Sequence, residues 1–287
     1  MTEAQLLGVV GGGLIGAGVA HCAARAGHPV VLVDLDGEAL ARAQGRILES
    51  VHLQRLLGGG GTSVRREELM ARIRFTTDPA GLEGAFLVVE AVTERRELKE
   101  EVFRRLDGLC PPETLFASTT SAIPITRLAA ATGRPDRVLG LHFMNPVALK
   151  PQVEMVRGFH TSEATLEAGR AFLAGLGKTA ILVNDSPGFV TNRVLMMTLN
   201  EAIFLLHERV AGAVEIDSVF KGCFGHKMGP LETADMIGLD TVLQSLEVLQ
   251  ESFGDSKYRP CPLLRQMVDA GLLGRKSGQG FHTYRVP

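Results

Sequence analysis

A histidine interrupts an apolar run in the segment VLGLHFMNP, residues 138–146. The aliphatic neighbours predict a buried strand, and Asn145-Pro146 predicts the turn that ends it. His142 could be a core residue that hydrogen-bonds a backbone carbonyl. It could also be a general base at the tip of the strand, because imidazole exchanges protons readily near neutral pH.

A carboxylate follows His142 at a spacing that could serve such a base. Glu154 stands twelve residues later in the apolar segment VEMV, residues 153–156. If the two strands are neighbours, Glu154 can reach the imidazole nitrogen that faces away from a substrate, fix its tautomer and stabilise the imidazolium. A solvated glutamate is the alternative interpretation of Glu154 taken alone.

A glycine-rich turn near the N-terminus predicts a dinucleotide site. The segment GGGLIG, residues 11–16, follows an apolar strand and opens a helical pattern. Gly11 would allow the tight turn, Gly13 the approach of a pyrophosphate, and Gly16 the close packing of helix and strand. Leu14 and Ile15 complete the turn, and the N–H groups of the helix N-terminus can bind phosphate oxygens.

The residue at the end of the next strand indicates which dinucleotide. Asp34 lies 18 residues after Gly16, where a carboxylate can accept hydrogen bonds from both ribose hydroxyls. The carboxylate would repel the 2′-phosphate of NADP, and Leu35, Asp36 and Gly37 provide no arginine to receive it. The sequence therefore favours NAD as the cofactor.

These residues need a scaffold of alternating strands and helices. Strands are expected at residues 6–11, 29–34, 72–77, 86–92, 114–119, 137–144, 153–156 and 179–183, with helices between most of them, for example at 38–57 and 97–109. This alternation predicts an α/β fold with a doubly wound, mostly parallel sheet of the Rossmann type. Four glycines at residues 58–61 predict a turn.

The pattern becomes helical after residue 185. A long helix is expected at 190–210, and further helices at 213–224, 233–253 and 262–273. Val194, Leu195, Thr198, Leu199, Ala202, Leu205 and Leu206 form an apolar stripe on the first. We therefore expect an NAD-binding domain at 1–185 and a smaller all-α domain at 186–287 that pairs two copies into a homodimer.

Composition excludes several other classes of protein. The formal net charge of −2 over 287 residues gives no signal for nucleic acid or membrane surfaces. Four cysteines without a C-x-x-C pair argue against zinc or a disulfide framework and suit the cytoplasm. The N-terminus has no charged segment typical of a signal peptide, and no apolar run reaches the ~18–20 residues of a membrane span.

Taken together, the motifs resemble a known enzyme family. GLIGAGVA, VDLD, FASTTSAI, LHFMNP, VEMV, DSPGFVTNR, HKMGPLETADMIGLDT and GRKSGQGF are similar, in order and spacing, to the NAD-dependent L-3-hydroxyacyl-CoA dehydrogenases, including the 3-hydroxybutyryl-CoA dehydrogenases. The resemblance covers nearly the whole chain. It implies a Rossmann domain that holds NAD and a helical domain that dimerises and closes over the acyl thioester.

The resemblance also implies roles for particular residues. It places the catalytic base at His142, the orienting carboxylate at Glu154, and substrate-binding groups at Ser121 and Asn192. Cofactor contacts are implied for Glu94, Lys99, Ser121, Asn145 and Lys276. Ser121 could otherwise cap the following helix, and Asn192 and Lys276 could be ordinary polar surface residues.

Two other classes of protein share parts of this pattern. The β-hydroxyacid dehydrogenases related to 6-phosphogluconate dehydrogenase use a lysine four residues before an asparagine, but Gly188 stands four residues before Asn192. A catalytically idle structural protein could also descend from the family, although the set His142, Glu154, Ser121 and Asn192 is intact.

The acyl carrier is the main open question. Family members that bind free CoA usually carry lysines, often K-G-K, where this chain reads HLQRLLGGGGTSVRREEL, residues 52–69. The acyl group could therefore be carried by CoA or by an acyl carrier protein, as in variants that serve polyketide extender-unit synthesis. The candidate cations for CoA phosphates are Arg46, Arg55, Arg65 and Arg66.

Overall fold

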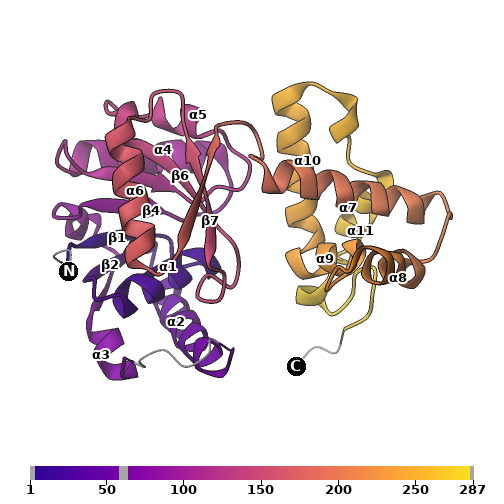
Figure 1. The fold of residues 1–287 in the computed structure, drawn as a ribbon, viewed down its shortest axis with the longest axis horizontal. Helices are drawn as coiled ribbons and strands as arrows, with labels where there is room; N and C mark the ends of the chain where they lie inside the picture. Colours follow the sequence, from indigo (N-terminus) through magenta and orange to yellow (C-terminus); the bar gives the residue numbers. More distant parts are fainter. Residues whose placement is uncertain (1–3, 58–63, 285–287) are drawn as a thin grey trace. The chain divides into compact units, whose positions relative to one another are not determined.

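The structure is a computed structural model that describes residues 4–57 and 64–284. The chain divides into two compact units, Met1–Ser186 and Pro187–Pro287 (Figure 1). The expected glycine turn at 58–61 lies outside the described residues.

The first unit is built on one eight-stranded sheet. Its strands are β1 (Leu7–Val10), β2 (Val30–Val33), β3 (Ile73–Thr76), β4 (Leu87–Glu90), β5 (Leu115–Ser118), β6 (Val138–Phe143), β7 (Gln152–Arg157) and β8 (Thr179–Asn184). They lie in the order β3-β2-β1-β4-β5-β6-β7-β8, and every neighbouring pair is parallel except β6 and β7. The predicted doubly wound, mostly parallel sheet is confirmed.

Helices cover both faces of this sheet (Figure 1). They are α1 (Leu14–Arg25), α2 (Gly37–Leu57), α3 (Arg66–Ala71), α4 (Arg96–Leu109), α5 (Ile125–Ala129) and α6 (Glu163–Gly175). Side chains of α1, α2, α3 and α6 share one core with one face of the strands. On the other face, Phe103 of α4 packs edge-on against Phe116 of β5. Strands β1, β2, β4, β5 and β6 are largely apolar on both faces because both of their faces are buried.

The second unit is mainly helical over the residues described, with isolated β-bridges near its C-terminal end. Its helices are α7 (Thr191–His207), α8 (Ala213–Phe224), α9 (Pro230–Ile237), α10 (Leu239–Phe253) and α11 (Pro262–Asp269), which share one apolar core. The single helix expected at 233–253 is wrong. Gly238 separates α9 from α10. Its φ of 101° is a backbone conformation that residues other than glycine rarely adopt.

The apolar stripe expected on α7 is only partly buried. Leu199 and Ala202 lie in the core of the unit, together with Met196 and Ile203, whereas Val194 is 63% exposed. The buried face is therefore rotated from the one expected. No helix in residues 4–57 or 64–284 is long and apolar enough to cross a membrane.

Candidate active site

The antiparallel pairing of β6 and β7 brings the two candidate catalytic side chains together. His142 and Glu154 are directly paired residues of the two strands, so their side chains leave the same face of the sheet. The imidazole Nδ1 lies 2.9 Å from Glu154 Oε2, and both residues are buried. A carboxylate in this place accepts a hydrogen bond from Nδ1–H. The free lone pair of the ring is then on Nε2, on the opposite side of the ring.

Ser121 lies on that opposite side. Its Oγ is 3.1 Å from His142 Nε2. Ser121 belongs to the loop after β5, at the carboxyl edge of the parallel strands, where ligands of doubly wound sheets bind. Glu154, His142 and Ser121 therefore form a continuous hydrogen-bonded row that ends at a hydroxyl beside the candidate base.

The glycine turn has the geometry that a dinucleotide requires. Gly11 has φ of 97°, and a Cβ at Gly16 would lie 1.9 Å from the carbonyl oxygen of Gly11. A Cβ at Gly13 would approach nothing closer than 4.0 Å, so the backbone there is open to a phosphate. Gly12 is a further requirement that the motif did not identify, because its Cβ would lie 2.3 Å from the Ala43 side chain.

Asp34 is tied to the same turn. Its Oδ2 accepts a hydrogen bond of 2.7 Å from the N–H of Gly12, and its Oδ1 accepts one of 2.8 Å from Leu35. Arg46 donates to the carbonyl oxygen of Gly12 at 3.0 Å. Its guanidinium therefore contacts the dinucleotide turn in this structure, and its contact with a CoA phosphate stays a prediction.

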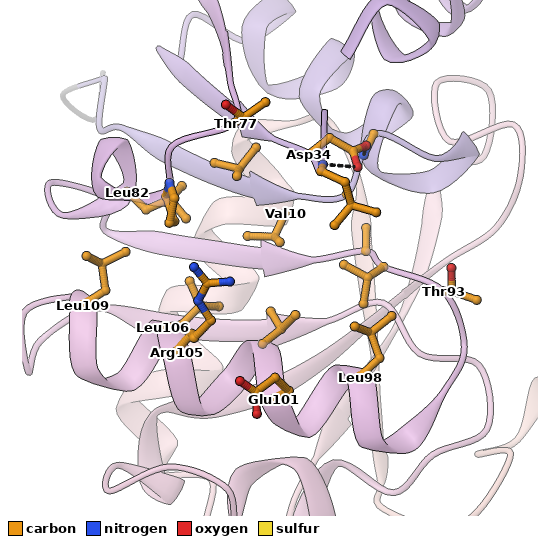
Figure 2. Close-up of a pocket in the computed structure, with 18 of the residues that line it drawn as sticks. Val10, Asp34, Thr77, Leu82, Thr93, Leu98, Glu101, Arg105, Leu106 and Leu109 are labelled. Atoms are coloured by element: carbon orange, nitrogen blue, oxygen red, sulfur yellow. Dashed lines mark hydrogen bonds between the residues drawn. The ribbon is translucent and has the colours of Figure 1, made fainter. Parts of the chain in front are cut away.

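A cavity of about 630 Å³ begins at this turn. Figure 2 shows Asp34 at one side of the cavity and the α4 residues Leu98, Glu101 and Arg105 at another. Thr93, from the loop between β4 and α4, also lines it. A mostly apolar cavity with the glycine turn and a carboxylate on its wall fits the adenosine and pyrophosphate part of NAD.

Two residues expected to contact the nicotinamide make protein contacts in this structure. The Lys99 ammonium lies 2.7 Å from Glu90 Oε1 and 3.4 Å from Glu94 Oε2, and Lys99 is 1% exposed. Glu94 Oε1 accepts hydrogen bonds from the loop after β5. Direct cofactor contacts by Glu94 and Lys99 stay predictions.

The remaining predicted site residues lie in different surroundings. Asn145 follows β6 and is exposed, Arg55 lies exposed near the end of α2, and Asn192 lies in the first turn of α7. Lys276, in the helical unit, forms an ion pair with Asp240 at 2.5 Å. The binding roles of these four residues stay predictions.

Sequence reasoning missed the residues that shape the loops around the site. Lys178 is buried and donates to the carbonyl oxygens of Val147 and Lys150, which fixes the loop after β6. Burial lowers the pKa of the Lys178 ammonium. Glu90 is fully buried at the end of β4. A glutamate that ends the apolar run LVVE was the available signal, because a carboxylate in a parallel strand needs a partner.

Comparisons with known proteins identify the family of the chain. The model of the 3-hydroxyacyl-CoA dehydrogenase NAD-binding domain matches residues 6–186, and that of the C-terminal domain matches residues 188–284. A probable 3-hydroxybutyryl-CoA dehydrogenase of Deinococcus radiodurans is 48% identical over 96% of this chain and 99% of that protein. The human mitochondrial hydroxyacyl-coenzyme A dehydrogenase is 39% identical over 96% of this chain and 90% of its own length.

A solved structure gives the same result. The (S)-3-hydroxybutyryl-CoA dehydrogenase of Ralstonia eutropha superposes with a TM-score of 0.91 at 41% identity, covering 99% of this chain and all of that one. The chain therefore belongs to the 3-hydroxyacyl-CoA dehydrogenase family of NAD-dependent oxidoreductases.

Proposed function

We propose that the chain oxidises the 3-hydroxyl of an L-3-hydroxyacyl thioester, with His142 as the general base. The single observation that carries this proposal is the row from the buried Glu154 and His142 to the half-buried Ser121, with separations of 2.9 and 3.1 Å. NAD, when bound, supplies the carbon that accepts the hydride from C3.

The three side chains divide the work as follows. His142 Nε2 removes the hydroxyl proton, and Glu154 stabilises the resulting imidazolium through Nδ1. Ser121 Oγ, beside Nε2, donates to the substrate oxygen and so holds C3 in the orientation that hydride transfer needs. In the reverse direction the imidazolium returns the proton to the forming alkoxide. Asn192 is proposed as a second group that binds the substrate.

The proposed substrate is a short-chain 3-hydroxyacyl-CoA, of which 3-hydroxybutyryl-CoA is the first to test. The printed names of the relatives from Deinococcus radiodurans and Ralstonia eutropha support this choice. A 3-hydroxyacyl group on an acyl carrier protein is the second candidate. It is favoured by the glycines that stand where CoA-binding relatives usually have lysines.

The helical unit is proposed to form a homodimer. Three apolar side chains of α8, those of Val214, Val219 and Phe224, are 63%, 50% and 66% exposed in the single chain. A second copy would bury such a surface. Closure of this unit over the acyl thioester, a cofactor contact by Lys276 and a cytoplasmic location belong to the same proposal.

The decisive experiment replaces the proposed base. We expect His142→Gln to keep the fold and the affinity for NADH while lowering kcat by about 10²–10⁴, the usual share of general acid–base catalysis. Steady-state assays with 3-hydroxybutyryl-CoA and NAD measure kcat. The change in NADH fluorescence on titration with the protein measures the affinity for NADH. Near-normal turnover in this variant would remove His142 from the mechanism.

The partner variant Glu154→Gln tests whether the two residues act as a unit. We expect it to slow turnover, and the double variant to cost less than the product of the two single effects, because Glu154 acts through His142. Effects that simply multiply would mean that Glu154 does not orient the base.

A further inference from the structure

Five polar residues next to the Ser121 loop form a closed ring of hydrogen bonds and ion pairs, in which four links join side chains and one runs through the backbone N–H of Thr120. The ring passes from Lys99 to Glu90 at 2.7 Å and from Glu90 Oε2 to the Ser118 hydroxyl at 2.6 Å. The Ser118 hydroxyl accepts from the N–H of Thr120 at 3.1 Å, and the Thr120 hydroxyl donates to Glu94 Oε1 at 2.5 Å. The ion pair between Glu94 and Lys99, 3.4 Å long, closes it.

The ring joins the ends of two strands to a helix. Glu90 ends β4, Ser118 ends β5, and the two residues are paired across the parallel ladder. Lys99 comes from the first turns of α4. Four members are at most 1% exposed, namely Glu90, Lys99, Ser118 and Thr120. Polar groups that are buried and mutually satisfied have few alternative arrangements, so such a network is stiff.

The part of the ring that faces the active site is Glu94. Its Oε1 also accepts from the backbone N–H of Ser121 at 2.9 Å and of Ala122 at 3.1 Å. This carboxylate oxygen, together with the Thr120 hydroxyl that accepts from the N–H groups of Ala122 and Ile123, therefore holds the backbone that carries the Ser121 hydroxyl. That hydroxyl lies 3.1 Å from His142 Nε2. A displacement of the Ser121 backbone would therefore change the distance between Ser121 Oγ and His142 Nε2.

We infer that this ring is a positioning device for Ser121, and that Glu90, Lys99, Ser118 and Thr120 support turnover through that hydroxyl. The inference rests on the proposed roles of Ser121 and His142. It assigns Lys99 to the support of the loop, through Glu94 and Glu90. The ring sets the hydroxyl before substrate arrives, so its loss should affect turnover more than binding.

The test removes one hydroxyl of the ring without changing the shape of the side chain. We expect Thr120→Val to lower kcat for 3-hydroxybutyryl-CoA about ten- to hundredfold, since a shift of ~1 Å in a positioning group has effects of this size. The KM for NAD should change little, and the isotope effect on kcat with substrate deuterated at C3 should rise. Thr120→Ser keeps the hydroxyl and should restore kcat.

A matched control lies at the other end of the same strand. Thr114 precedes β5, is 1% exposed and donates its hydroxyl to the carbonyl oxygen of Ala85 at 2.9 Å. Thr114→Val removes an equally buried hydrogen bond far from Ser121. It should lower the melting temperature as Thr120→Val does, and leave kcat and the isotope effect at the wild-type values. An equal loss of kcat in both variants would contradict the inference, because it would mean that the ring contributes only to the stability of the fold.

A double-mutant cycle with Ser121→Ala decides whether the ring acts through Ser121. If it does, Thr120→Val causes little further loss of kcat when the serine hydroxyl is already absent. Losses that multiply would overturn the inference and leave the proposed function standing. Normal turnover in Ser121→Ala alone would overturn the proposed role of Ser121, and the inference with it. Should Thr120→Val fail to fold, Ser118→Ala opens the ring with a smaller change and enters the same cycle.

Discussion

Two buried histidines of the first unit show how the surroundings of a side chain decide its chemistry. His142 Nδ1 meets the carboxylate of Glu154, which can compensate a positive ring. His21 Nδ1 meets the Ser50 hydroxyl at 2.7 Å, which cannot. Burial, with a smaller effect of the Arg25 and Lys178 charges, lowers the pKa of His21 to about 4. The two rings therefore differ in whether a carboxylate stands beside them.

Asp34 should determine the choice of cofactor. We expect Asp34→Ala to lower the affinity for NAD about ten- to hundredfold, which corresponds to the loss of hydrogen bonds to a charged acceptor. The preference of the enzyme for NAD over NADP should become smaller. Asp34→Asn keeps an oxygen for the Gly12 N–H and removes the charge, so it separates repulsion of the 2′-phosphate from organisation of the turn. The KM values for both cofactors measure these effects. A wild-type chain that prefers NADP would contradict this interpretation of Asp34.

At the scale of elements, the site depends on how neighbouring segments are tied at their ends. Lys178 holds the loop after β6, and Asp185 accepts hydrogen bonds from the N–H groups of Ile125 and Thr126 at the start of α5. The glycine turn leads into α1, and Gly12 of the turn lies against Ala43 of α2. The hydrogen bond between His21 and Ser50 joins these two helices.

Packing of α1 on α2 should make the stability of the fold sensitive to acid. His21 has an ordinary pKa of 6.5 and a folded value of about 4. Between these values the unfolded chain binds the proton more readily than the folded chain, so stability falls as pH falls. Lowering the pH from 7 to 5 should cost about 2 kcal/mol from this group. Urea unfolding at both pH values measures the change.

The matched variant is His21→Asn, whose amide can still pair with the Ser50 hydroxyl but does not titrate in this range. Its stability should decline less than that of the wild type between pH 7 and pH 5. Parallel declines in the two proteins would show that His21 does not carry the effect.

At the scale of the whole molecule, the open question is how the chain recognises the carrier of its acyl group. Arg46 donates to the carbonyl oxygen of Gly12 and remains a candidate cation for CoA phosphates. The other candidates, Arg55, Arg65 and Arg66, are exposed. No group of three or more His, Cys, Asp or Glu side chains suited to a metal ion occurs among the residues described.

The carrier is tested with two substrates that differ only in the nucleotide. We expect kcat/KM for 3-hydroxybutyryl-CoA to exceed that for the matching pantetheine thioester by only about three- to thirtyfold, because exposed ion pairs contribute ~0.5–1 kcal/mol each. The advantage should shrink at high salt. An advantage above about a hundredfold would show that the nucleotide is firmly held, and would end the case for a carrier protein.

The sequence by itself determined the local chemistry of this protein. The glycine turn, Asp34 at the end of the second strand, and the alternation of strands and helices follow from short-range rules of backbone conformation and hydrophobic periodicity. The family resemblance drew on the same motifs, added Ser121 and Asn192, and favoured the general base over the core residue as the role of His142. Wrong details, such as the unbroken helix over 233–253, arose where one glycine adopted a conformation that periodicity does not reveal.

Only the tertiary structure decided which of these groups act on one another. The antiparallel pairing of β6 with β7 places Glu154 opposite His142, whereas their separation along the chain is all that can be read without the fold. Arg46, a candidate for CoA phosphates by its charge, donates a hydrogen bond to the dinucleotide turn. The ring next to Ser121 joins residues that are up to 30 positions apart, from Glu90 to Thr120. Such contacts depend on strand order and register, which are set by the packing of the whole sheet and not by any local pattern.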